Sequence, residues 1–129
     1  MQRENISNNS SREDVIGFSR MVKVGPHVFI SGTSAIDNTG NIVGVNDPYE
    51  QTRQIILNIK KGMERINAGL ENIVRTRIYL VSMNDWKKVA KAHSEFFGDI
   101  RPATTILEIK HLMRSEMLVE MEADAIVET

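Results

Sequence analysis

The sequence predicts an α+β protein, a two-layer sandwich in which two helices cover one face of a mixed β-sheet. Three observations point to this fold class. Short runs rich in β-branched and aromatic residues, the pattern of strands, are interleaved with two longer stretches of helical periodicity. Each of these stretches has one apolar stripe, so we expect both helices to pack on the same face of the sheet. The elements follow one another in the order ββ(β)αβαββ.

The polar start of the chain predicts no packed structure of its own. Residues 1–13 include the run Asn-Asn-Ser-Ser at 8–11 and few apolar side chains. A segment of this composition buries too little surface to offset the entropy lost on ordering. We therefore expect a flexible lead-in over 1–13 and one folded domain over 14–129.

Two short strands open the domain, at residues 19–24 and 27–31. Gly25-Pro26 lies between them and suits a tight hairpin turn. Residues 42–43 are a candidate for a short edge strand.

The first helix has a strong start signal. Asp47 can cap it, Pro48 suits its first position, and Glu50 completes a pattern like a capping box. Gly69 is a natural stop, and a strand over 73–81 follows. The apolar stripe of the helix consists of Thr52, Ile55, Ile56, Ile59, Met63 and Ile66.

The second helix begins at Asn84 or Asp85 and ends near Gly98. Its apolar positions recur at helical spacing, which predicts an inner face turned toward the sheet. That face consists of Trp86, Val89, Ala90, His93, Phe96 and Phe97.

Two strands close the chain, over 104–110 and 117–127. Side chains on a strand alternate between its faces, so the last strand has one apolar face and one acidic face. Burying a carboxylate is costly unless it is paired, so the acidic face must meet water, cations or a ligand. The apolar face carries Val119, Met121, Ala123 and Ala125, and the other carries Leu118, Glu120, Glu122, Asp124 and Ile126.

Composition excludes several classes of chemistry. The 16 Lys+Arg nearly balance the 17 Asp+Glu, so nothing favours nucleic acid or a membrane surface as a partner. The chain has no cysteine, which rules out thiol catalysis, and its three histidines lack ligand-like spacing, so we expect no metal. No apolar run approaches the roughly 20 residues that span a bilayer, and no signal peptide is recognisable, so we expect a cytoplasmic protein.

Glu120 is the first candidate for a functional residue. It could act as a general acid and base on a substrate nitrogen or a water, or it could be a solvated or salt-bridged strand carboxylate. Glu122 and Asp124 have a structural explanation, because Arg75 and Arg77 on the neighbouring strand can pair with them.

Four further positions could contribute to a site. His93 lies on an apolar stripe, where a core histidine with one hydrogen bond is the alternative to a catalyst. Arg20 and Arg101 could each bind an anion. The alternative for Arg20 is a rim or interface salt bridge, and the alternative for Arg101 is a cation on a loop. Ser31-Gly32 offers backbone that a ligand can approach closely, because glycine has no side chain.

Taken together, these residues resemble the RidA/YjgF family of reactive-intermediate imine deaminases, also called the endoribonuclease L-PSP family. The resemblance covers about residues 16–127, and its motifs are specific only in combination. They are Val28-Phe29-Ile30-Ser31-Gly32-Thr33, Asn58-Ile59, the strand over 74–80, Asn84-Asp85-Trp86, Phe96-Phe97, Arg101-Pro102-Ala103 and Val119-Glu120-Met121-Glu122-Ala123.

The resemblance implies a fold, an assembly and a chemistry. The fold is like that of chorismate mutase, and the assembly is a homotrimer whose sheets face inward, with three clefts between subunits. Deaminases of the family hydrolyse imines and enamines, such as those derived from 2-aminoacrylate, to 2-keto acids and ammonia without a cofactor. A small-molecule ligand is therefore the expected partner.

Only part of the substrate site of the family's deaminases is present in this sequence. Their strand glutamate falls on Glu120 and their Ser-Gly pair on Ser31-Gly32, whereas their tyrosine near the chain start falls on Phe18. Their helix tyrosine falls on His93. Their arginine after the Pro-Ala pair, which grips the substrate carboxylate, falls on Thr104, as in a divergent subgroup. A hydroxyl cannot replace a bidentate charge, so Arg20 or Arg101 would have to substitute for it.

Three functions remain open from the sequence. The first is a hydrolase for an imine, enamine or related compound, with Glu120 handling protons and Ser31-Gly32 and Thr104 orienting the substrate. The second is a trimeric protein that binds metabolites without turnover. The third, a ribonuclease, has the least support, since a net charge of −1 offers little for phosphate binding.

Overall fold

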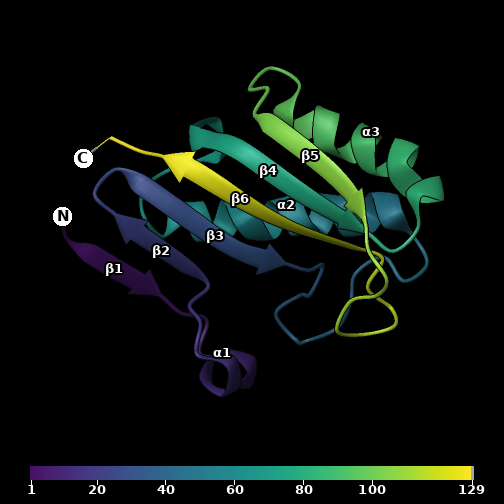
Figure 1. Cartoon of the computed structure of the whole chain (residues 1–129), viewed down its shortest axis with the longest axis horizontal. Helices are drawn as coiled ribbons and strands as arrows, with labels where there is room; N and C mark the ends of the chain where they lie inside the picture. The colour runs from purple at the N-terminus through teal and green to yellow at the C-terminus, as the bar shows by residue number, and fades with distance from the viewer. Residues whose placement is uncertain (129) are drawn as a thin grey trace.

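A six-stranded mixed sheet forms one layer of the protein, and helices cover one of its faces (Figure 1). The structure is a computed structural model that describes residues 1–128. It confirms the α+β fold class. The strands are β1 (Arg3–Ile6), β2 (Met21–Val24), β3 (His27–Thr33), β4 (Ile73–Leu80), β5 (Ala103–Glu108) and β6 (Val119–Ile126). The helices are α1 (Ser11–Ile16), α2 (Pro48–Glu64) and α3 (Trp86–Phe97), with single 3₁₀ turns η1 (Leu70–Asn72) and η2 (Met83–Asp85).

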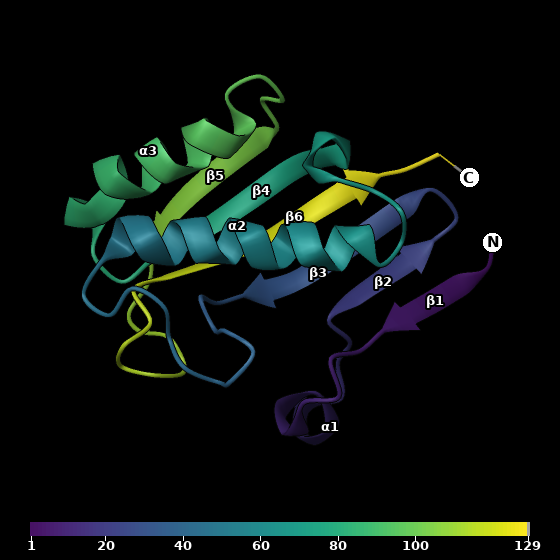
Figure 2. The same cartoon turned by 180° about the vertical axis from the view of Figure 1, so that it is seen from behind.

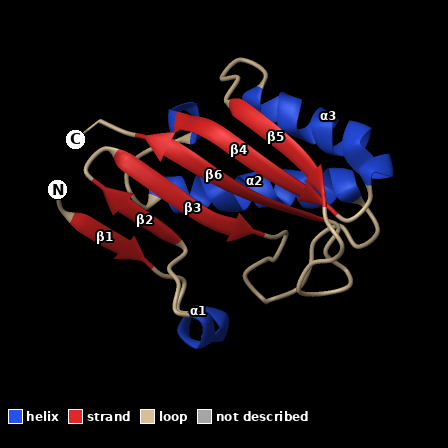
Figure 3. Ribbon diagram, viewed as in Figure 1, coloured by secondary structure: helices blue, strands red, loops and turns tan. Residues whose placement is uncertain are grey.

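The last strand of the chain lies in the middle of the sheet. The strand order is β1-β2-β3-β6-β4-β5, so β6 pairs with β3 on one side and β4 on the other. Neighbouring strands are antiparallel, except that β4 and β5 are parallel and are connected through α3. This arrangement matches the expected mixed sheet (Figure 3).

Helices α2 and α3 lie side by side on the same face of the sheet, as Figure 2 shows from that side. The core lies between these two layers. The apolar face of β6 is fully enclosed there, with Val119, Met121 and Ala123 all at 0% exposure. The opposite face of β6 carries the acids, as the alternation predicts. None of the described helices is both long and apolar enough to span a bilayer.

The start and the inner face of α2 follow the sequence signals. The Asp47 side chain accepts a hydrogen bond from the Glu50 amide, and Pro48 occupies the first turn. The stripe from Thr52 to Met63 is buried. A Cβ at Gly62 would lie 2.8 Å from Met21 Sδ, so the absence of a side chain lets the helix approach β2 closely.

Two details of the strands differ from expectation. Strict alternation would place Val74 on the core face of β4 together with Thr76 and Ile78, but a bulge between Ile73 and Arg75 shifts the register there. Ile73 is therefore buried and Val74 is 44% exposed. The expected edge strand at 42–43 is only an isolated bridge between Ile36 and Ile42.

The N-terminal segment also differs from the expected flexible lead-in over 1–13. Strand β1 extends the sheet by pairing with β2, and α1 follows it. A buried carboxylate holds this segment, because Glu13 accepts hydrogen bonds from the Ser7 and Ser10 hydroxyls, each at 2.8 Å. Arg65 at the end of α2 donates to Asn8 and to the Ser7 carbonyl. The order comes from polar contacts, which the low apolar content did not reveal.

We predict that Glu13→Gln loosens β1 and α1 and lowers stability by about 1–3 kcal/mol, because an amide cannot accept from all these donors. Burial raises the pKa of Glu13, but hydrogen bonds from Ser7, Ser10 and the Asn8 amide outweigh it and hold the pKa below its usual value. A depressed pKa means that the contribution is complete above the unfolded-state value and is lost as the pH falls through the folded-state value.

Amide hydrogen exchange of β1 and α1 between about pH 3 and 6 tests this prediction. Asp14→Asn is the matched control, because Asp14 is exposed and lies in the same helical turn. Equal protection of β1 in wild type and Glu13→Gln at neutral pH would contradict it.

Candidate functional site

Glu120 lies on the open face of the sheet, directly over the backbone of Gly32. A Cβ placed on Gly32 would come within 2.8 Å of Glu120 Oε2, so only glycine leaves room for the carboxylate. The register between β3 and β6 shifts between Ile30 and Thr33, which displaces Ser31 and Gly32 from the regular ladder. Ser34 Oγ donates to Glu120 Oε1 at 3.2 Å. We call Gly32, Ser34 and Glu120, together with Arg20, the Glu120 cluster.

Arg20 is the cation of this cluster. Its Nη2 donates to the Gly32 carbonyl, and its Nε is enclosed without a hydrogen-bond partner among residues 1–128. Burial lowers the pKa of Arg20, while the charges of Glu13 and Glu120 raise it in part. An arginine remains charged under such conditions, so positive charge lies beside Gly32.

Phe18 and Ser31 support this end of the sheet. The Arg20 guanidinium lies 6.0 Å from the centre of the Phe18 ring, and the Ser31 hydroxyl donates to the Ser19 carbonyl at 2.7 Å. Phe18 and Ser31 therefore hold the segment that carries Arg20.

A hollow of about 480 Å³ opens beside Glu120. It is lined by Tyr79, Ile109, His111, Leu112, Met113 and Glu120. Its walls are mostly apolar, and the carboxylate is one of its few polar groups. A small molecule in this hollow would meet Glu120.

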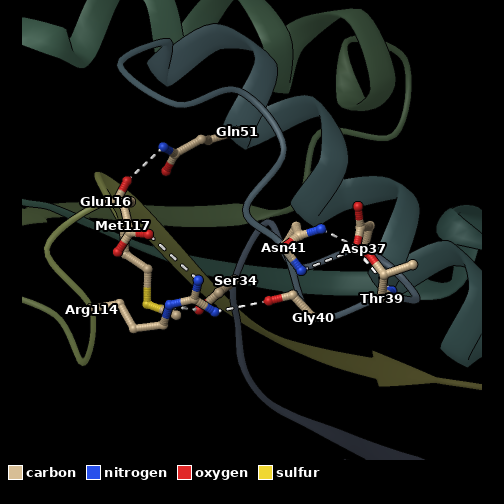
Figure 4. A network of polar contacts seen from close by, with 9 residues as sticks. All are labelled: Ser34, Asp37, Thr39, Gly40, Asn41, Gln51, Arg114, Glu116 and Met117. Carbon is tan, nitrogen blue, oxygen red and sulfur yellow. Dashed lines mark hydrogen bonds and ion pairs between the residues drawn. The ribbon is translucent and has the colours of Figure 1, made fainter.

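Two loops that flank the Glu120 cluster are tied together by polar contacts (Figure 4). Arg114 donates to the Gly40 carbonyl at 3.0 Å, and Ser34 Oγ lies 3.6 Å from Met117 Sδ. The enclosed Gln51 amide donates to the carbonyl of Glu116 at 2.8 Å. These contacts fix the approach of the chain to β6.

The remaining acids of the open face are paired, as the sequence predicts. Arg77 Nη1 lies 3.2 Å from Asp124 Oδ2 and 3.8 Å from Glu122 Oε1, and Arg75 Nε lies 4.0 Å from Asp124. Tyr79 donates to Glu122, and this hydrogen bond raises the pKa of Tyr79 to about 12. Glu120 differs from its neighbours because no ion pair of the described residues includes it.

His93 and Thr104 form a separate group on the helix side of the sheet. Thr76 and Thr104 are register partners in the parallel pair β4–β5, so their side chains point to the same face. Thr76 Oγ1 lies 3.0 Å from His93 Nε2 and 2.8 Å from Thr104 Oγ1. Within one chain Thr104 is therefore not beside Glu120, and a site that includes both requires a second subunit.

Arg101 has a structural role at the end of α3. Its backbone is in the left-handed region, with φ 55°, and its amide donates to the Phe97 carbonyl at 2.8 Å. Its Nε donates to the Gly98 carbonyl at 2.9 Å. A cation there complements the negative end of the helix dipole. Of the two candidate substitutes for the missing arginine, the structure brings only Arg20 to Gly32.

Sequence reasoning did not single out Ser34, Thr76 or Tyr79. Ser34 comes shortly after Ser31-Gly32, but its direction depends on the shifted register of β3, which the alternation pattern does not encode. Thr76 lies on the core face of β4 and Tyr79 on the open face, as the alternation of strand side chains requires. Within residues 1–128, no group of three or more His, Asp and Glu side chains is arranged to hold a metal ion.

Comparison with known proteins identifies the family of this chain. The sequence matches the family model described as Endoribonuclease L-PSP over residues 10–127. A RutC family protein of Pyrococcus abyssi is 36% identical over 126 residues, which cover 97% of this chain and 98% of the relative. The chain belongs to the YjgF/RidA family. An uncharacterised Streptomyces coelicolor protein is 33% identical over 120 residues, covering 93% of this chain and 89% of the relative.

Crystal structures of other YjgF/RidA proteins have the same fold. A Mycobacterium tuberculosis member of the YjgF/YER057c/UK114 family has a TM-score of 0.87 and 36% identity, covering 98% of this chain and 100% of the other. A Yersinia pestis protein of the Rid family, of unknown function, has a TM-score of 0.86 and 27% identity, with coverage of 98% and 100%. The resemblance read from the sequence is confirmed.

We predict that Gly32→Ala displaces the Glu120 carboxylate while changing the stability by less than about 1 kcal/mol. The new Cβ meets only the far end of the Glu120 side chain, and Gly32 has no positive φ that would strain an alanine. A crystal structure and a thermal melt of the variant provide the measurement. Gly62→Ala is the control, since its Cβ also meets a flexible side chain, that of Met21, but far from Glu120. An unmoved Glu120 in Gly32→Ala would show that the two do not compete for space.

Proposed function

We propose that this protein is a cofactor-independent hydrolase that acts on an imine, an enamine or a related small metabolite. One observation carries this proposal. Glu120 lies beside a mostly apolar hollow, over backbone that has no side chain, and it forms no ion pair among residues 1–128. A carboxylate held in this way can exchange protons with a bound molecule.

The chemistry requires only one group that both accepts and returns a proton. Glu120 takes a proton from a water as the water oxygen bonds to the carbon of a protonated imine, which gives a neutral carbinolamine. Glu120 then returns this proton to the carbinolamine nitrogen. The C–N bond breaks as the hydroxyl group becomes the carbonyl and passes its proton to Glu120, which releases it to solvent. The products are a carbonyl compound and ammonia, and neither oxidant nor reductant is needed.

A homotrimer would complete the site. The open face of the sheet carries the charged ladder of Arg75, Arg77, Glu122 and Asp124, which lacks a covering layer in the single chain. The Glu120 cluster and Thr104 lie on opposite sides of the sheet, so a cleft between subunits is the simplest way to join them. Homotrimers with such clefts are also what membership of the family implies.

A substrate carboxylate would be bound differently here than in deaminases that have an arginine at the position of Thr104. Thr104 offers one hydroxyl, already in contact with Thr76 and Pro102. The Arg20 guanidinium lies beside Gly32 in the Glu120 cluster, and its Nη2 already donates to the Gly32 carbonyl. A substrate carboxylate would therefore be bound less strongly than by a free bidentate arginine.

The second candidate function is a trimer that binds metabolites without turnover. Thr104 favours it, because this residue supplies no charge to stabilise a reacting anion. A ribonuclease has the least support, since a net charge of −1 offers little for phosphate binding.

We predict that Glu120→Gln abolishes turnover of imine substrates and leaves the melting temperature unchanged or raised. Functional carboxylates are often held at some expense to stability, and Glu120 has no ion pair to lose. Thermal melting and an ammonia-release assay on a panel of imines measure both effects.

Glu122→Gln is the matched control on the same face of β6. It weakens the acceptor of Tyr79 and the contact with Arg77, so the melting temperature should fall. Because both side chains are about a third exposed, the loss from the ion pair itself is on the order of 1 kcal/mol or less in the single chain. A destabilised Glu120→Gln beside an unaffected Glu122→Gln would overturn the assignment of Glu120 as the functional acid.

We predict a homotrimer in solution, because assembly would cover the charged face and join the two halves of the site. Multi-angle light scattering at micromolar concentration measures the mass directly. A monomeric mass would exclude the intersubunit cleft.

A further inference from the structure

An apolar and basic patch lies at the start of α3, in the helix layer that Figure 2 shows from outside. Trp86, which the sequence pattern places on the inner face of the helix, is instead 45% exposed. Met83, whose carbonyl accepts from the Trp86 amide, is 37% exposed. Lys87, Lys88 and Lys91 are exposed beside them. We call these residues the α3 patch.

The lysines of the α3 patch are not neutralised by neighbouring acids. No ion pair of residues 1–128 includes Lys87, Lys88 or Lys91. Glu95 follows Lys91 by one helical turn, where such a pair can form, but its carboxylate accepts from the Tyr49 hydroxyl at 3.1 Å.

Aromatic rings hold two of these ammonium groups instead. Lys87 Nζ lies 5.9 Å from the centre of the Trp86 ring, and Lys91 Nζ lies 5.3 Å from the centre of the Tyr49 ring. A ring face attracts a cation without cancelling its charge. Two positive charges are therefore positioned on the surface and remain available to an anionic partner.

The stability of α3 does not explain this composition. Lys87 and Lys88 lie in the first turn of the helix, where the positive end of the helix dipole disfavours cations. That turn contains no acid, and the Asp85 side chain makes no capping hydrogen bond. Tryptophan is also usually well covered in folded proteins, unlike Trp86. A partner that brings carboxylates and an apolar side chain would offset both costs.

The spacing of the α3 patch fits a short acidic peptide. Met83, Lys87 and Lys91 follow one another at intervals of four residues, and in a helix this interval is about 6 Å along the axis. Alternate side chains of an extended peptide share one face and are about 6.6 Å apart. An apolar side chain followed by two acids at alternate positions can therefore lie over Met83, Lys87 and Lys91.

Other polyanions fit the α3 patch less well. Lipid surfaces attract clusters of about four to eight cations, whereas the patch contributes three lysines. Nucleic acid would meet a chain whose net charge is −1, which offers little for a phosphate backbone.

We propose that the α3 patch is a docking surface for an extended acidic segment of another protein. Carboxylates of that segment pair with Lys87 and Lys91, and its apolar side chain packs on Trp86 and Met83. The inference goes beyond the proposed hydrolase, because the patch shares no residue with the Glu120 cluster or with the hollow beside it. A homotrimer built through the open face of the sheet would leave the patch accessible.

The fluorescence of Trp86 tests the proposal on the whole protein, because this residue is the only tryptophan of the chain. The probe is an acetylated and amidated peptide with Leu, Glu and Glu at alternate positions, separated by serines. It should shift the Trp86 emission to shorter wavelength in a saturable way, with a dissociation constant on the order of 0.1 mM. Raising the salt concentration to about 0.5 M should weaken binding about fivefold, since exposed charges are screened.

Two control peptides separate the contributions. Replacing both glutamates of the probe by glutamine should weaken binding about fivefold, as expected of two exposed ion pairs. Replacing its leucine by serine should cost about as much, through the lost apolar contact with Trp86 and Met83. Equal binding of either control peptide would overturn the proposal.

Charge-matched variants locate the surface, with a fluorescein-labelled probe peptide and its anisotropy as the readout. The double variant Lys87→Gln and Lys91→Gln should bind the probe about fivefold more weakly. The control is the double variant Lys60→Gln and Lys61→Gln, which removes the same charge from exposed positions of α2 and should bind like the wild type. Equal affinities of the two double variants, or a larger shift of the Trp86 emission with phosphatidylserine vesicles than with the probe, would overturn the proposal.

Discussion

The enclosed side-chain amide of Gln51 is the contact on which the position of the central strand depends. Gln51 lies in the first turns of α2 and is 0% exposed. Its nitrogen donates to the carbonyls of Gly44 and Glu116, and its oxygen accepts from the Leu118 amide at 2.9 Å. One side chain thus joins the loop before α2 to the loop before β6, because buried backbone groups must find partners. The entry of β6, and with it Glu120, follows from this contact.

Much of the architecture could be predicted from the sequence because it depends on short-range patterns. The alternation along β6 places Met121 in the core and Glu120 on the open face, and the helix start at Asp47-Pro48 is where the capping signals indicate. The part that could not be predicted depends on contacts between distant segments. Strand β1 was missed because Glu13 orders it through hydrogen bonds, while its own side chains are polar.

The candidate site shows the same division. Glu120 and Gly32 could be named from the sequence, and the structure brings them together across β3 and β6. Thr104 and His93 could also be named, but the register of β5 against β4 places Thr104 beside Thr76, which contacts His93 on the other side of the sheet. A bulge in β4 and a register shift in β3 likewise escape a strict alternation. Sequence patterns identify which residues are special, whereas pairing register decides which of them are neighbours.

The central place of β6 also constrains how the protein is made. Strand β3 pairs with β6 through residues 27–33 and 119–126, so the sheet cannot close until residues 119–126 have left the ribosome. Until then β3 and β4 each present an unpaired inner edge, and such edges are templates for pairing with other chains. The nascent chain is thus exposed to misassembly from the emergence of β3 until β6 emerges, and chaperones that shield strand edges would act in this interval.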